Sequence, residues 1–266
     1  MSFTADGSAV VYVGLAESGQ STQLWLRRWS DLRAEPIPGT TGAITFALSP
    51  DEREVAFAPL GASLSAVPLN GGPGRTLNES PIGAVGAWSS DGYVYFGVAV
   101  GPAGIARVNA GQGGSAAEVL TELSDGETIH SNVRLLPGAR FGVFQVWHEQ
   151  DGTGDEIWVL DLDSRERRML IAGSNPWYSP SGHLLYGTSE GTLLAVPIDP
   201  RSAELTGAPA PLADGLVVRP PYGTIDYAVS SNGSLLYRRG GLSATEAEFV
   251  WMTRAGHATP VDPGWR

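Results

Sequence analysis

A four-residue turn sequence recurs six times along this chain and limits its possible folds more than any other feature. Its fullest form is Ser-x-Asp-Gly, as in Ser89-Ser90-Asp91-Gly92. Asp-Gly and Asn-Gly favour tight hairpins, because glycine adopts positive φ without strain and Asp or Asn tolerates it. An apolar segment follows each turn, so we expect it to fold back antiparallel on the segment before it. The aspartate position is occupied in turn by Asp6, Asp51, Asp91, Pro137, Ser181 and Asn232, at intervals of 45, 40, 46, 44 and 51 residues.

Each predicted hairpin is followed by another β-rich segment and then, in several units, by a shorter one. Four strands in about 44 residues match one blade of a β-propeller. Neighbouring sheets would bury each other's apolar faces around a channel lined by the innermost strands. The predicted fold is therefore all-β, a six-bladed β-propeller of four-stranded antiparallel blades, forming a single domain over residues 1–266. The predicted innermost strands are Met1–Phe3, which is short, and Ile44–Leu48, Val85–Trp88, His130–Leu135, Asn175–Tyr178 and Thr224–Val229.

Composition excludes several classes of function. The net charge of −11 opposes phosphate backbones, so we do not expect a nucleic-acid partner. All 17 basic residues are arginine, and the lack of lysine excludes a Walker A loop, a kinase ATP lysine and a Schiff-base lysine. Without cysteine there is no disulfide framework and no thiolate nucleophile, and the redox state of the compartment stays open.

Motifs within the blades add a family resemblance. The Ser-Pro-Asp-Gly-like turns, together with segments such as Ile157–Asp161, resemble the TolB-type propeller, which is related to WD repeats. More narrowly, Leu193–Pro200 and Phe249–Gly256 resemble the propeller regions attached to bacterial eukaryotic-like serine/threonine kinases. This resemblance implies an appended sensor or interaction region, with the kinase domain outside these residues and the chain an excerpt of a longer protein. An alternative is that the C-terminal tail completes the first blade.

The chain departs from the family pattern at three turns. Glu52, Pro137 and Ser181 stand where glycine or aspartate is usual. We expect these turns to be the least regular of the six.

One segment matches a catalytic motif literally. Gly187-Thr188-Ser189-Glu190-Gly191 fits the G-x-S-x-G nucleophile elbow, which requires a strand, a strained turn and then a helix. Here a second apolar strand follows, so we interpret the segment as a hairpin. The four histidines lie in four different repeats and form no H-x-x-x-H pair, and we expect each on the surface or in a turn. They are His130, His148, His183 and His257.

Two acidic clusters offer oxygen ligands of the kind that calcium accepts. Neither Asp151–Glu156 nor Asp161–Asp163 has the spacing of an EF-hand loop, and the first is interpreted as a solvated loop between strands. The recurrent aspartates are interpreted as turn residues, since they repeat in phase with the fold. We therefore predict no catalytic residue, no metal ligand and no cofactor for this chain.

The channel mouth is the expected binding site, because loops from several blades converge there. Polar side chains at the mouth would bind a protein, a peptide or a small polar ligand, with two aromatic rings for stacking. A channel filled only with water remains open as the alternative. The candidate rim residues are Thr41, His130, Asn132, Asn175, Trp177, Tyr222, Thr224 and Asp226.

The leading hypothesis is thus a non-catalytic interaction or sensor propeller of a bacterial signalling protein, with a protein or peptide as its partner. The alternative is an enzyme role, as the gating propeller of a prolyl-oligopeptidase-like serine peptidase or as a metal-dependent propeller enzyme. No apolar run approaches the length of about 20 residues that spans a bilayer, and Met1–Asp6 lacks signal-peptide features, so we expect no membrane contact by this segment. Compartment and oligomeric state stay open.

Overall fold

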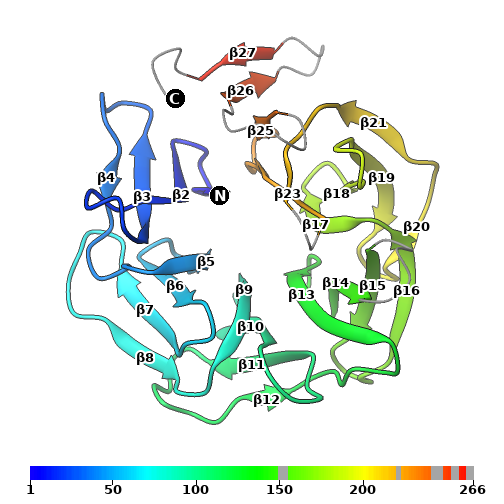
Figure 1. The fold of residues 1–266 in the computed structure, drawn as a ribbon. Helices are drawn as coiled ribbons and strands as arrows, with labels where there is room; N and C mark the ends of the chain where they lie inside the picture. Colours follow the sequence, from blue (N-terminus) through cyan, green and yellow to red (C-terminus); the bar gives the residue numbers. More distant parts are fainter. Residues whose placement is uncertain (149–154, 220–222, 241–247, 253–257, 262–266) are drawn as a thin grey trace.

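The computed structural model consists of six antiparallel sheets arranged in a ring around a central channel (Figure 1). It describes residues 1–148, 155–219, 223–240, 248–252 and 258–261. The described residues form strands and no helix. This arrangement confirms the predicted six-bladed β-propeller.

In each blade the strands follow one another from the channel outward in chain order. Blade 1 contains β1 (Ser2–Phe3), β2 (Ala9–Leu15), β3 (Thr22–Arg28) and β4 (Glu35–Pro36). Blade 2 contains β5 (Ala43–Leu48), β6 (Glu54–Pro59), β7 (Leu64–Pro68) and β8 (Arg75–Asn78). Blade 3 contains β9 (Ile82–Trp88), β10 (Tyr93–Val98), β11 (Ile105–Asn109) and β12 (Glu118–Val119).

The second half of the ring contains blades 4, 5 and 6. Blade 4 contains β13 (Glu127–Leu135), β14 (Phe141–His148), β15 (Glu156–Asp161) and β16 (Arg167–Ala172). Blade 5 contains β17 (Ser174–Ser179), β18 (His183–Gly187), β19 (Leu193–Asp199), β20 (Glu204–Leu205) and β21 (Ala210–Ala213). Blade 6 contains β24 (Tyr227–Val229), β25 (Leu235–Arg239), β26 (Glu248–Met252) and β27 (Ala258–Pro260), and is preceded by the pair β22 (Val218–Arg219) and β23 (Thr224–Ile225).

The recurrent turns close the inner hairpin of every blade. In blade 2 the Ser49 carbonyl accepts a hydrogen bond from the Glu52 amide at 2.9 Å, and the Ser49 hydroxyl donates to Asp51 Oδ1 at 2.7 Å. Asp51 Oδ1 also accepts from the amide of Arg53 at 3.2 Å. The aspartate therefore holds the turn together, as its periodic spacing predicted. At the position where glycine is usual, Glu52 adopts φ 57°, so this turn keeps its shape despite the departure.

Six buried apolar clusters fill the six seams between blades. Each cluster combines residues of two adjacent blades and none is confined to one sheet. Between blades 1 and 2, for example, Val11 and Leu24 pack with Val55 and Phe57. Adjacent blades therefore hold each other in place by burying the faces that a lone sheet would expose.

The blade 5 to blade 6 region departs from the simple repeat. An additional strand, β21, pairs with β19 beside β20, which accounts for the longest of the turn intervals. The predicted innermost strand Thr224–Val229 is divided at Asp226 into β23 and β24, and β23 pairs with β22. Its division corrects the prediction of one continuous strand. The tail considered as a completion of blade 1, Gly264-Trp265-Arg266, lies outside the described residues, and β1 supplies the inner strand of that blade.

The seam between blades 6 and 1 closes the ring through aromatic packing. Trp251 of β26 contacts Trp29 edge-on, with ring centroids 4.8 Å apart, and contacts Phe3 at 5.8 Å. No strand is exchanged between the two blades among the described residues. Closure therefore depends on this aromatic contact more than on backbone pairing.

We expect Trp251→Ala to lower the free energy of unfolding by about 2–4 kcal/mol, because it removes the central ring of the closing seam. Urea denaturation followed by far-UV circular dichroism measures the loss. Trp25→Ala is the matched control, since Trp25 occupies the corresponding strand of blade 1 and belongs to no seam cluster in the described part of the chain. An equal or larger loss in the control would contradict the closing role of Trp251.

Candidate functional site

The central channel encloses a cavity of about 1460 Å³, lined by side chains from all six blades. A second cavity of about 670 Å³ lies against the inner turns of blades 3 and 4 and against β17 of blade 5. Four residues of three inner strands line both cavities: Ala87, Trp88, Arg134 and Trp177. They therefore lie where the two cavities adjoin.

The structure places four of the eight candidate rim residues in the channel lining. These are Asn132, Asn175, Trp177 and Asp226. Thr41 is exposed before β5, and Thr224 pairs with Arg219 in β23, so neither lines the channel. Tyr222 lies outside the described residues. Ligand binding by the four lining residues stays a prediction.

The inner strands of blades 4 and 5 share one irregularity that shapes the channel wall. Each carries a bulge, located between Ser131 and Arg134 in β13 and between Ser174 and Trp177 in β17. An asparagine in the left-handed region lies within each bulge, and Asn132 and Asn175 both have φ 52°. Asparagine tolerates this conformation better than other non-glycine residues. Two positions later, the side chains of Arg134 and Trp177 line the channel.

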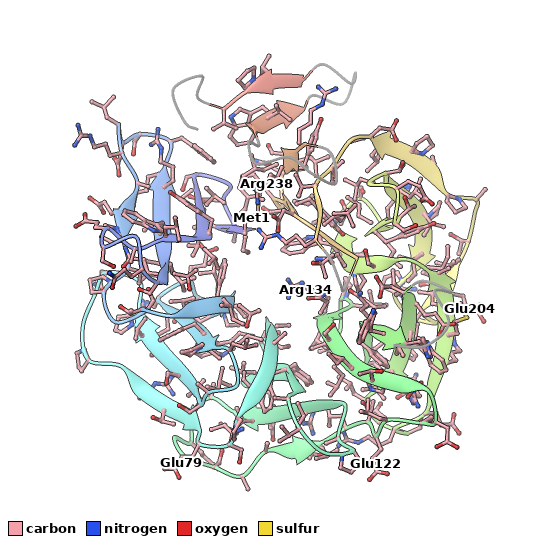
Figure 2. The ribbon with its side chains drawn as sticks, viewed as in Figure 1. Met1, Glu79, Glu122, Arg134, Glu204 and Arg238 are labelled. Atoms are coloured by element: carbon pink, nitrogen blue, oxygen red, sulfur yellow. The ribbon has the colours of Figure 1, made fainter. Side chains whose placement is uncertain are left out.

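Arg134 stacks on Trp177 across the seam between blades 4 and 5. Its guanidinium carbon lies 4.7 Å from the ring centroid, within the range of a cation–π interaction. Arg134 donates one long hydrogen bond within the described residues, 3.5 Å from Nη1 to the carbonyl of Val133. Burial lowers the pKa of Arg134 to about 10, so it remains charged at neutral pH. Figure 2 shows Arg134 at the channel side of blade 4.

Arg134 was not among the residues predicted from sequence. A signal was available, since Ser131-Asn132-Val133-Arg134 and Ser174-Asn175-Pro176-Trp177 occupy the same place in successive blades. Aligning the two tetrapeptides would have placed Arg134 and Trp177 at equivalent positions of adjacent inner strands.

Asp226 of the candidate set is already paired with arginine. Its Oδ2 accepts from Arg219 Nε at 2.9 Å and Nη2 at 2.5 Å, and Arg238 Nη1 lies 3.7 Å away. One carboxylate is thus shared between two guanidinium groups. The cluster keeps a net positive charge on the blade 6 side of the channel, where Figure 2 labels Arg238.

A buried glutamine holds the two asparagines in place. Gln145 Oε1 accepts from Asn132 Nδ2 at 2.8 Å and from the Asn175 amide at 3.1 Å. A Gln145 hydrogen bond also reaches Asp155, whose pKa burial raises to about 6. Asn175 Oδ1 is buried without a hydrogen-bond partner in the described part of the protein. The asparagines therefore shape the wall of the channel, and part of their hydrogen-bonding capacity is already used.

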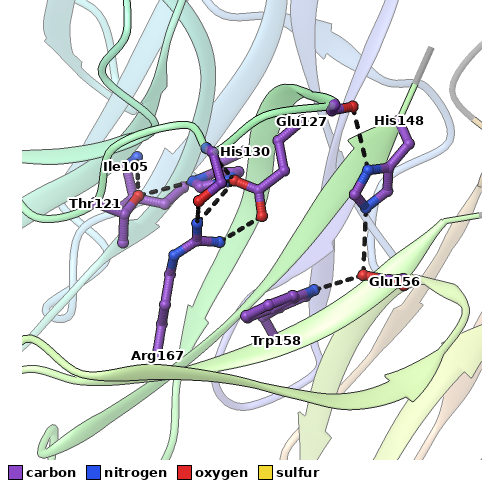
Figure 3. A network of polar contacts seen from close by, with 10 residues as sticks. Ile105, Thr121, Glu127, His130, His148, Glu156, Trp158 and Arg167 are labelled. Atoms are coloured by element: carbon purple, nitrogen blue, oxygen red, sulfur yellow. Dashed lines mark hydrogen bonds and ion pairs between the residues drawn. The ribbon is translucent and has the colours of Figure 1, made fainter. Parts of the chain in front are cut away.

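His130 is buried in the seam between blades 3 and 4, which corrects its assignment to the surface and to the rim (Figure 3). Its Nδ1 lies 2.8 Å from Thr121 Oγ1, and its Nε2 lies 3.1 Å from Glu127 Oε2. Arg167 donates to both oxygens of Glu127, at 2.7 and 2.8 Å. The strand β13 begins at Glu127, three residues before its predicted start, so His130 lies within the strand and not at its exposed end.

Burial lowers the pKa of His130 to about 4 against the attraction of Glu127. The unfolded chain protonates this histidine near pH 6.5, so below that pH the unfolded state binds more protons and stability falls. We expect the free energy of unfolding to fall by about 2 kcal/mol between pH 6.5 and 4.5 on account of His130.

Urea denaturation across that pH range measures this contribution. His130→Gln cannot titrate and should show a flatter profile. His183→Gln, at the first residue of β18, is the control and should follow the unchanged protein. An identical pH slope in the His130 variant would disprove the assignment.

The segments considered for catalysis and metal binding have structural roles where they are described. Gly187–Gly191 forms the hairpin between β18 and β19, with the Gly191 amide donating to the Thr188 carbonyl at 3.1 Å. Asp161 Oδ1 accepts from the amide of Asp163 at 2.9 Å and so stabilises a turn. Residues 151–154 of the other acidic cluster lie outside the described residues. Within the described ranges, no three His, Asp or Glu side chains are grouped so that they could hold a metal ion.

No helix in the described part of the chain is long and apolar enough to cross a membrane. No family model matches this chain, and no curated protein matches it by sequence. Several solved structures do resemble it.

TolB from Acinetobacter baumannii superposes with a TM-score of 0.60 and 18% identity, covering 79% of this chain and 53% of TolB. Puromycin hydrolase has a TM-score of 0.61 and 19% identity, covering 97% of this chain and 46% of the hydrolase. An oligogalacturonate lyase in complex with manganese has a TM-score of 0.59 and 13% identity, covering 94% of this chain and 87% of the lyase. The chain thus spans about half the length of the TolB and hydrolase structures. The similarity at these identities concerns the fold, and the chain has the six-bladed β-propeller fold found also in TolB proteins.

Proposed function

We propose that this chain is a non-catalytic binding module whose channel takes up a segment of a protein or peptide. The observation that carries this proposal is the 1460 Å³ channel, into which Arg134 and Trp177 project from adjacent blades. Tryptophan and arginine are among the residue types that contribute most of the binding free energy at protein interfaces. Such a site on a rigid ring of blades needs no rearrangement of the scaffold to bind.

The setting of this module is a larger bacterial signalling protein, such as a serine/threonine kinase. The support comes from sequence, since Leu193–Pro200 resembles the propeller regions attached to such kinases. In the structure this segment contains β19, the central strand of blade 5, which pairs with three other strands. A kinase sequence encoded upstream of residue 1 would support this setting.

Peptide selection tests the binding function. The purified chain, immobilised and presented with a random peptide library displayed on phage, should enrich peptides that bind with micromolar affinity. Trp177→Ala should weaken that binding at least tenfold, because it removes the aromatic surface in the channel. Trp25→Ala is the control, because the Trp25 side chain does not line the channel. Failure to enrich any peptide, or equal binding by the Trp177 variant, would refute a peptide site in this channel.

An enzyme role is the second candidate, and the similarity to puromycin hydrolase and oligogalacturonate lyase favours keeping it. In the peptidase version the propeller covers a catalytic domain encoded after residue 266, and an α/β-hydrolase sequence there would support it. In the metal-dependent version the channel holds an ion. We expect manganese at 1 mM to raise the melting temperature by no more than about 1 °C, since the described residues present no grouped ligands. A larger, saturable rise would favour the metal-dependent enzyme.

A further inference from the structure

The charge of the channel is opposite in sign to that of the whole chain. The chain carries a net charge of −11, yet the charged groups that line the larger cavity in the described part of the structure are mostly arginines. Two carboxylates accompany them, Glu52 and Asp226. The lining arginines are Arg134, Arg219, Arg238 and Arg239. An acidic protein with a cationic channel is electrostatically suited to a ligand with localised negative charge.

Within the described residues, Arg134 is the partly buried cation of this lining that has no carboxylate partner, whereas Arg239 also has none but is exposed. Arg219 and Arg238 share Asp226, whereas Arg134 forms no ion pair within the described residues. Its long bond to Val133 leaves most of its five N–H donors unused. A partly desolvated guanidinium without a carboxylate is costly, so one that lines a cavity is a candidate site for a ligand that supplies the missing charge.

The stacking geometry decides which anion fits. Trp177 covers one face of the guanidinium, so the edges that carry the N–H donors remain free. Two parallel N–H donors match the two oxygens of a carboxylate in one plane. The acidic exterior repels polyanions before they reach the channel, whereas a ligand with a single carboxylate meets little electrostatic repulsion.

We infer that the channel binds a peptide carboxylate, with Arg134 as its bidentate anchor and Trp177 as the surface that orients the guanidinium. This inference rests on the proposed function and specifies its ligand. The carboxylate belongs either to a peptide C-terminus or to an aspartate or glutamate side chain. Arg219 and Arg238 add a favourable field from blade 6.

The test uses the whole chain labelled with ¹⁵N-arginine and small probes for each source of carboxylate. N-acetylglycine represents a chain terminus, the α-amide of N-acetylglutamate represents an acidic side chain, and N-acetylglycinamide is the neutral control. We expect a saturable shift of the Arg134 Nε–H resonance with one or both carboxylates and none with the amide. The resonance is assigned from its absence in Arg134→Gln.

Arg134→Gln should weaken carboxylate binding at least tenfold, measured through the other channel resonances. Arg134→Lys keeps the charge but loses the planar guanidinium with its two parallel N–H donors. This variant should bind carboxylates several-fold more weakly than the unchanged protein. It replaces Arg134→Gln in the test if the glutamine variant does not fold. Arg140→Gln is the matched control and should bind normally. Arg140 is likewise stacked on a ring, that of Phe141, but it is paired with Asp161 outside the channel.

Equal shifts with N-acetylglycinamide, or undiminished binding by Arg134→Gln and Arg134→Lys, would overturn the carboxylate site. Trigalacturonate is a further probe, and binding more than tenfold tighter than that of either peptide carboxylate would assign the site to an acidic saccharide instead. Selected peptides that need Trp177 but tolerate amidation and lack acidic residues would leave the binding function standing and refute this inference. Carboxylate binding without any selected peptide would support the carboxylate site and refute the peptide-binding function.

Discussion

Burial of apolar faces between adjacent blades is the interaction on which the rest of this structure depends. A four-stranded sheet exposes two faces, and each blade here covers both by contact with its two neighbours. All six clusters of buried apolar residues lie across seams, from Val11 and Phe57 between blades 1 and 2 to Phe3 and Leu236 between blades 6 and 1. Stability therefore resides in the seams.

The sequence predicted the fold because hairpin chemistry is local. A serine and an aspartate two residues apart bond to each other and to the next amides, as Ser49 and Asp51 do, whatever the rest of the chain does. Six such turns in phase imply six equivalent units. Even Glu52, which departs from the pattern, adopts the positive φ that the turn requires. The break at Asp226 was not predicted, because β23 pairs with β22 in an additional hairpin that carries no Ser-x-Asp-Gly turn.

The candidate site was predicted less completely because it depends on strand starts and bulges. His130 was assigned to the rim because the predicted inner strand began at His130. The observed strand β13 begins three residues earlier, so His130 lies in a buried network with Glu127 and Arg167. Arg134 was missed because its direction is set by the bulge at Asn132 and by the buried amide of Gln145. Neither cause appears in hydrophobic periodicity, which identifies strands but not the side that an irregular residue faces.

Packing between blades 4 and 5 explains how the protein tolerates an arginine without an ion pair. Withdrawing Arg134 from water without a carboxylate costs free energy, and the pKa of about 10 reflects that cost. The tryptophan face offsets part of it through the cation–π contact. The buried cluster between blades 4 and 5 supplies stability from residues that do not line the larger cavity. A carboxylate that enters the channel would remove the remaining penalty without moving a blade. The free energy of binding would then come chiefly from the ion pair between that carboxylate and Arg134, which the folded chain leaves without a carboxylate partner among the described residues.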